Sequence, residues 1–269
     1  MVFFRAYFIL LVIIFLNMAE KFYKNEKFQK IFYALLYFAL AITFAITGAS
    51  IFHNRYYTNI YVSGSSMMPT LIGNTSNRVH YGISDNHERA LRSLKRFDVV
   101  ITYYPWNIPE GYTDEVYKIK RVWGFPGETI SLSFSFEDNK FTFTAGEGEN
   151  VRYTITAPVK TKEVSNGVST STWNVAEFVT PEKTFYTHAY NNITDSKREF
   201  TVTLDKDKQE YFLMGDNWLG STDSYSHRSE SKRITFNDLQ GKVVRIEGTA
   251  KVDGDELRDK KRIKALYYF

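Results

Sequence analysis

Cysteine is absent from this chain of 269 residues, and histidine occurs only five times. Without thiols the chain cannot form a disulfide scaffold, a cysteine-ligated zinc or iron–sulfur centre, or a cysteine nucleophile. The histidines form no H-x-x-x-H pair, so we expect no metal site and no cofactor. Hydrophobic residues make up 43% of the chain and aromatic residues 17%, which excludes a wholly disordered protein.

Acidic residues are scarce near the N-terminus. Residues 1–57 contain six basic and two acidic residues, a net charge of +4. The whole chain has 34 basic and 30 acidic residues, so the other 212 residues hold 28 of each sign and carry no net charge. A basic excess confined to a short apolar region is typical of a membrane anchor, and we expect no nucleic-acid partner.

Two apolar runs lie in this anchor. Residues 31–52 form 22 uncharged positions, about 33 Å of helix, which is enough to cross a ~30 Å hydrocarbon core. We interpret the shorter run, residues 6–19, as a second, retained membrane helix; a signal-peptide core or an interfacial segment are the alternatives. The lysine-rich segment AEKFYKNEKFQK between the runs indicates a cytoplasmic loop. Residues 1–57 are thus predicted to be a multi-pass anchor in the inner (cytoplasmic) membrane, with the rest of the chain on the extracytoplasmic side.

Residues 58–269 have a different composition. Short segments of alternating apolar and polar residues recur, namely ISLSFSF, KFTFTA, VRYTITA, REFTVTL and RFDVVIT. Such period-two segments between turn clusters predict strands, and only residues 85–96 suggest a short helix. The fold class is therefore predicted to be mostly β, a β ectodomain tethered by two N-terminal transmembrane helices.

One segment of the ectodomain, YVSGSSMMPTLIGN, places a serine in an unusual setting. Ile60, Val62, Gly64 and Ser66 alternate onto one face of an extended segment. A small residue two positions before the serine leaves the backbone open to a ligand. Taken alone, the segment is better explained as an ordinary serine-rich turn after a membrane span.

Two later segments add further candidates. In YKIKRVWGFPGE, Lys120 is flanked by Ile119 and Val122, and apolar surroundings should lower its pKa below the usual ~10.4. A neutral amine can act as a general base for a serine hydroxyl, although a solvated strand lysine is the simpler explanation. In YFLMGDNWLGSTDSYSHR, an apolar strand enters a Gly-Asp-Asn turn, and a polar loop with Ser221 follows.

In this order, behind a membrane helix, these segments resemble the type I signal peptidases. GSSMMPTL at 64–71 is similar to the family's nucleophile box, and RFDVV at 96–100 to its R-G-D-V-V-like strand. Residues 117–128 resemble its general-base box, and GDNWLGSTDS at 215–224 its last box. The resemblance implies a mostly β Ser/Lys endopeptidase that removes signal peptides after a small-x-small site, usually Ala-x-Ala.

The resemblance also implies roles for individual residues. Ser66 falls at the nucleophile, Lys120 at the general base, and Ser221 at the serine that orients the lysine. The Ser66 N–H is the implied oxyanion donor. Some relatives add a hydroxyl two positions earlier, where this chain has Gly64, so either one donor suffices or a neighbouring serine, Ser63 or Ser65, contributes.

The substrate is expected to run as an added strand beside residues 60–66. The substrate-binding residues predicted from the resemblance are Ile60, Val62, Gly64, Met67, Leu71 and Ile119. Residues 129–210 match no box and resemble the family's variable β insertion. Asp98, Asp216 and Asn217 are interpreted as structural residues of the turns around the site.

The sequence departs from the family pattern at one position. Tyr225 stands where the family usually has an arginine, so Asp223 lacks its expected neighbour. We hypothesise that Arg121 or Arg228 supplies the compensating charge.

The expected partners are signal-peptide-bearing preproteins and the lipid bilayer, and the protein is expected to be monomeric. Two other functions remain open: a dedicated maturation peptidase for a pilus or conjugation substrate, and a catalytically inactive, membrane-anchored homologue. Self-cleaving repressor peptidases share the Ser/Lys chemistry, but they carry a DNA-binding domain where this chain has an anchor.

Overall fold

A computed structural model describes most of the chain, and it divides into two compact units, residues 1–55 and 56–269. The boundary falls two residues before the predicted end of the anchor at residue 57. The described residues are 12–14, 26–73, 78–104, 117–135, 137–148, 150–165, 170–181, 183–188, 199–218, 220–222, 224, 233–254 and 256–267.

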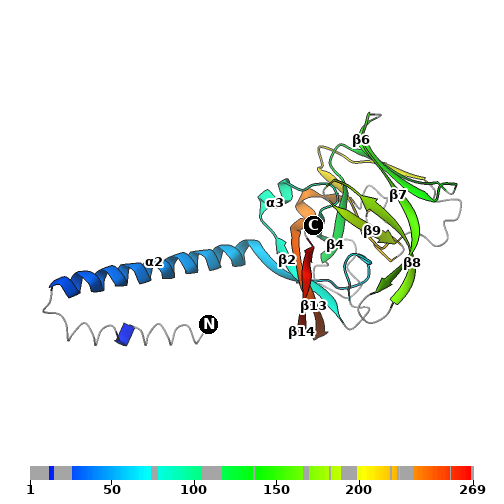
Figure 1. Ribbon diagram of the computed structural model, residues 1–269. Helices are drawn as coiled ribbons and strands as arrows, with labels where there is room; N and C mark the ends of the chain where they lie inside the picture. Colours follow the sequence, from blue (N-terminus) through cyan, green and yellow to red (C-terminus); the bar gives the residue numbers. More distant parts are fainter. Residues whose placement is uncertain are drawn as a thin grey trace, which may run out of the picture. The chain divides into compact units, whose positions relative to one another are not determined.

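The long helix α2, Glu26–Tyr56, makes up nearly all of the described part of the first unit, and its last residue is the first of the second unit (Figure 1). Its segment Gln29–Tyr56 has a mean hydropathy of 2.0 and is, among the described residues, the one helix long and apolar enough to cross a membrane. Its most apolar window is not buried against protein, which suits a span in contact with lipid. The helix begins before the predicted residue 31, so residues 26–30 of the predicted cytoplasmic loop are helical.

The other apolar run, residues 6–19, lies outside the described residues except for positions 12–14, which are helical. The second membrane helix therefore stays a prediction.

The second unit is mostly β, as predicted, and its described residues form two antiparallel sheets and a short helix. Among the described residues the first sheet has eight strands in the order β1-β2-β13-β3-β4-β11-β12, with β14 paired to β13. Its strands are β1 Tyr57–Tyr61, β2 Val79–Asp85, β3 Val99–Tyr103, β4 Tyr117–Gly124, β11 Glu210–Met214, β12 Ile234–Thr235, β13 Leu239–Asp253 and β14 Glu256–Tyr267. A short helix, α3 Glu88–Arg92, falls inside the predicted helical segment 85–96, and a 3-10 turn, η4 Phe236–Asp238, precedes β13.

The predicted insertion, residues 129–210, supplies the second sheet. Its order β10-β5-β6-β7-β8-β9 follows the chain apart from β10, because successive strands are joined as hairpins. Its strands are β5 Thr129–Ser135, β6 Lys140–Glu147, β7 Asn150–Ser165, β8 Thr170–Val179, β9 Thr184–His188 and β10 Glu199–Thr203. Four of the five period-two segments lie in β5, β6, β7 and β10 to within one residue, because alternation exposes one face and buries the other. The fifth, RFDVVIT at 96–102, forms β3 only from Val99 onward.

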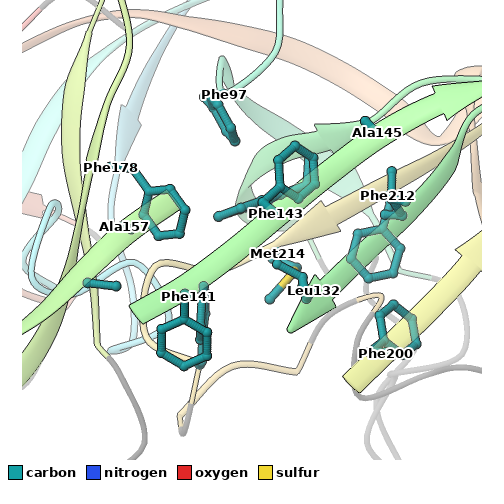
Figure 2. Close-up of a cluster of buried hydrophobic side chains, with 14 of the residues drawn as sticks. Phe97, Leu132, Phe141, Phe143, Ala145, Ala157, Phe178, Phe200, Phe212 and Met214 are labelled. Atoms are coloured by element: carbon teal, nitrogen blue, oxygen red, sulfur yellow. The ribbon is translucent and has the colours of Figure 1, made fainter. Parts of the chain in front are cut away.

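An aromatic core joins the two sheets. Figure 2 shows Phe143 and Phe178 of the second sheet in one cluster with Phe212 and Met214 of β11. Trp123, at the end of β4, is fully buried in the same cluster, with its ring centroid 5.1 Å from that of Phe143. The inner residues of the two sheets thus share one core, and this fixes the second sheet against the strands that carry the candidate site.

Candidate active site

The candidate nucleophile lies in a loop between β1 and β2, residues 62–73, which we call the serine loop. The Met68 N–H donates to the Ser65 carbonyl at 3.0 Å, and the Leu71 N–H to the Met67 carbonyl at 2.9 Å. The side chains of Met67 and Leu71 are fully buried in a hydrophobic cluster, whereas Ser66 stays partly exposed. The methionine and leucine therefore hold the loop while the serine remains at the surface.

His80 of β2 fastens both ends of the serine loop. Its carbonyl accepts from the Val62 N–H at 2.9 Å, and its N–H donates to the Ile72 carbonyl at 2.8 Å. Its ring nitrogen Nδ1 accepts from the Ile72 N–H at 3.0 Å. Burial lowers the pKa of His80 to about 4, so Nδ1 is unprotonated and can accept near neutral pH.

The turn that follows β11, residues 215–217, holds the serine from the other side. The Asn217 N–H donates to the Ser66 carbonyl at 2.9 Å, and its side-chain Nδ2 donates to the Ser65 carbonyl at 3.1 Å. A β-carbon at Gly215 would collide with the Ser66 carbonyl oxygen and with the Ser221 hydroxyl. The absence of a side chain at Gly215 thus brings Ser66 and Ser221 close to each other.

A buried ion pair supports this turn. Arg121 of β4 donates from Nε and Nη2 to the two carboxylate oxygens of Asp216, at 2.8 and 2.6 Å. Both side chains are at most 1% exposed. Arg121 also donates to the Phe97 carbonyl, and the Thr70 hydroxyl of the serine loop donates to Asp216. This network connects β4, the 215–217 turn and the serine loop.

Two arginines were predicted to compensate the charge of Asp223. Arg121, one of the two candidates, pairs with Asp216. Asp223, Tyr225 and Arg228 lie outside the described residues, so the compensating charge stays a prediction.

The candidate general base, Lys120, is on β4 opposite Val100 of β3, and only 1% of it is exposed. A cleft of about 550 Å³ opens beside it. Ser66 lines the same cleft, so the fold brings together a serine and a buried lysine that are 54 positions apart in the sequence. The lining residues are Asn59, Ile60, Tyr61, Val62, Ser63, Gly64, Ser65, Ser66, Ile101, Tyr117, Lys118, Ile119, Lys120, Gly220 and Thr222.

Four of the six predicted substrate-binding residues line this cleft; they are Ile60, Val62, Gly64 and Ile119. Met67 and Leu71 do not, because they are buried in the hydrophobic cluster of the serine loop. Gly64 has φ +85°, and a β-carbon there would meet nothing within 4 Å. Its backbone is therefore open on that side, as a peptide ligand would require.

Several residues that line the cleft were not predicted, notably Ile101, Tyr61 and Tyr117. Ile101 could have been found, because it lies in the RFDVVIT strand and pairs with Ile119. No pattern distinguishes the two tyrosines from others in the chain. Among the described residues, no group of three or more His, Cys, Asp or Glu side chains could hold a metal ion.

Comparison with known families supports the resemblance. The family model described as signal peptidase, peptidase S26, matches residues 33–246, from within α2 to within β13. The matched range contains Ser66, Lys120 and Ser221 together with the second sheet. A search of the curated proteins finds no match.

Proposed function

This chain belongs to the signal peptidase family, peptidase S26, and we propose that it is a membrane-bound serine endopeptidase that removes signal peptides from exported preproteins after a small-x-small site. The observation that supports the proposal most directly is the shared cleft of Ser66 and the buried Lys120. The proposed location is the inner membrane, with the catalytic domain on the extracytoplasmic side.

The proposed reaction is an acyl transfer in two steps. Lys120 takes the Ser66 proton while the serine oxygen attacks the scissile carbonyl carbon, and the resulting ammonium protonates the leaving amine. Lys120 then deprotonates a water molecule, whose oxygen attacks the acyl-enzyme ester, and the resulting ammonium returns the proton to the departing Ser66 oxygen. Burial of Lys120 favours its neutral amine, because transfer from water penalises the charged form. Ser221, next to Gly215, is proposed to orient the lysine.

The proposed oxyanion donor is the Ser66 N–H. Ser63 and Ser65 both line the cleft, so either hydroxyl is available as a second donor. The substrate is proposed to extend beside residues 60–66, where main-chain groups supply affinity. Ile60 and Ile119 form apolar walls that suit alanine-sized side chains.

The test compares the full-length wild type with S66A and K120A, in detergent, on a preprotein with an Ala-x-Ala site. Wild type should cleave after that site, and each variant should lose at least about 10³-fold in kcat/KM. S131A and K140A, on the second sheet, are matched controls and should cleave like wild type.

A folded wild type that cleaves no preprotein would overturn the proposal. Cleavage by K120A at the wild-type rate would overturn the assignment of the base. A panel of unrelated preproteins separates a general signal peptidase, which cleaves many, from a dedicated maturation peptidase, which cleaves one.

A further inference from the structure

His188 connects the second sheet to the 215–217 turn. It is the last residue of β9, the strand at one edge of that sheet. Its N–H donates to the Asp216 carbonyl at 2.6 Å, and its backbone forms a parallel bridge with Asn217. Its ring nitrogen Nδ1 lies 3.0 Å from the Asn217 side-chain oxygen Oδ1.

The other contacts of Asn217 determine the direction of this hydrogen bond. The Gly220 N–H donates to Asn217 Oδ1 at 3.2 Å, while Asn217 Nδ2 donates to the Ser65 carbonyl at 3.1 Å. These partners fix which end of the amide is oxygen. Because Oδ1 can only accept, His188 must carry its proton on Nδ1 and donate it.

The surroundings of His188 keep this donor in place. The Trp173 ring packs on the imidazole, with 4.2 Å between the ring centroids. Burial lowers the pKa of His188 against a smaller, opposing effect of the Asn217 hydrogen bond, so the ring is neutral near neutral pH. A neutral imidazole has one N–H, and the contact with Asn217 selects the Nδ1–H tautomer.

We propose that His188 is a positioning residue for Ser66, and that through it the second sheet takes part in catalysis. The proposal rests on the proposed peptidase function. It assigns the insertion, residues 129–210, a role in positioning the nucleophile. His188 orients the Asn217 amide, and Asn217 holds the Ser65 and Ser66 carbonyls, which sets where the Ser66 hydroxyl stands relative to Lys120. Misplacing a reacting group by about 1 Å can cost ~10²-fold in rate.

The first test separates kcat from KM. His188→Leu removes the donor, so kcat should fall about 10- to 100-fold while KM changes less than about twofold, because His188 is not among the residues lining the cleft. His188→Asn places an amide N–H where Nδ1 was and should recover most of kcat. Thr187→Val is the matched control, because Thr187 is buried on the same strand and its hydroxyl has no partner among the described residues. Wild-type kcat in H188L, or an equal loss in H188N, would overturn the proposal.

The second test does not depend on cleavage. In the 15N-histidine-labelled full chain, the His188 resonances, identified by their absence in H188N, should report the neutral Nδ1–H tautomer. Asn217→Ala should abolish that preference. An Nε2–H tautomer in wild type would overturn the inference even if the enzyme cleaves preproteins. An Nδ1–H tautomer in a protein that cleaves none would instead count against the proposed function alone.

Discussion

At the scale of single residues, two positions near Ser66, Gly215 and Gly64, require glycine for different reasons. Gly215 is required by space, because a β-carbon there would overlap the Ser66 carbonyl and the Ser221 hydroxyl. Gly64 is required by backbone conformation, because φ is +85° while the space around it is open. The first should therefore control the geometry of the site, and the second mainly the stability of the loop.

The pair of variants Gly215→Ala and Gly64→Ala tests this distinction. G215A should lower kcat at least about 100-fold, because the 215–217 turn must move away from Ser66. G64A should lower the free energy of unfolding by about 1–2 kcal/mol, with a smaller loss of kcat. Preprotein cleavage and urea unfolding measure the two effects. Equal kcat values for the two variants would contradict the steric role of Gly215.

At the scale of elements, β4 carries two neighbouring side chains, Lys120 and Arg121, that have different roles. Because successive residues of a strand point to opposite faces, Lys120 borders the cleft while Arg121 reaches Asp216 in the turn after β11. The Arg121 guanidinium also packs over the Phe185 ring of β9, with its central carbon 4.1 Å from the ring centroid. One strand thus carries the proposed base and the support of the turn that holds the nucleophile.

Asp216→Asn should destabilise the protein by about 3–5 kcal/mol, because it leaves the Arg121 charge buried without a counter-charge. Glu147→Gln removes one partner of the exposed Arg152–Glu147 pair and should cost less than about 1 kcal/mol. Urea unfolding of both variants checks the contrast. A similar cost for the two would mean that the buried pair contributes no more than a surface pair.

At the scale of the whole molecule, one buried carboxylate joins distant parts of the β unit. Asp98 accepts from Lys183, just before β9, at 2.8 Å and from Lys242 of β13 at 2.7 Å. Burial alone would raise its pKa, but the two ammonium groups and the Lys95 N–H outweigh burial and hold the pKa below its usual value. The stability that Asp98 contributes is thus present above pH 3.8 and is lost at more acidic pH.

His80 produces a separate pH window. Its pKa is about 4 in the folded protein and 6.5 in the unfolded chain, so between these values the unfolded chain binds more protons. The free energy of unfolding should therefore fall as pH drops from 6.5 to 4, by about 3 kcal/mol from this residue. In His80→Gln the fall over this range should be smaller by that amount, as measured by urea unfolding at each pH. Identical pH dependence in wild type and variant would contradict the assignment to His80.

Much of this protein could be predicted from local patterns in its sequence. An uncharged run long enough to span a bilayer predicts α2, and period-two alternation predicts the strands, because both signals depend only on neighbouring residues. The motif segments supported the family resemblance and identified Ser66 and Lys120 as the candidate nucleophile and base. Only the tertiary structure shows that the two residues line one cleft. Met67 and Leu71 were predicted to bind substrate, whereas their side chains lie in the hydrophobic cluster of the serine loop. Local patterns cannot distinguish these two positions, because an apolar residue beside a nucleophile suits a pocket wall and a core equally well.

The sequence by itself thus determined the long apolar helix, the fold class and the candidate chemistry, whereas the tertiary structure decided which groups hold that chemistry in position. Gly215 packs against Ser66, which lies far from it in the chain, and His188 reaches the serine loop through Asn217, 29 positions away. His80 holds the same loop from eight positions beyond Ile72, through a ring nitrogen that no local pattern assigns to this role. The contact of His188 leaves no periodic pattern in the sequence, because it arises when the two sheets pack around a shared core and bring the edge of one against a turn of the other.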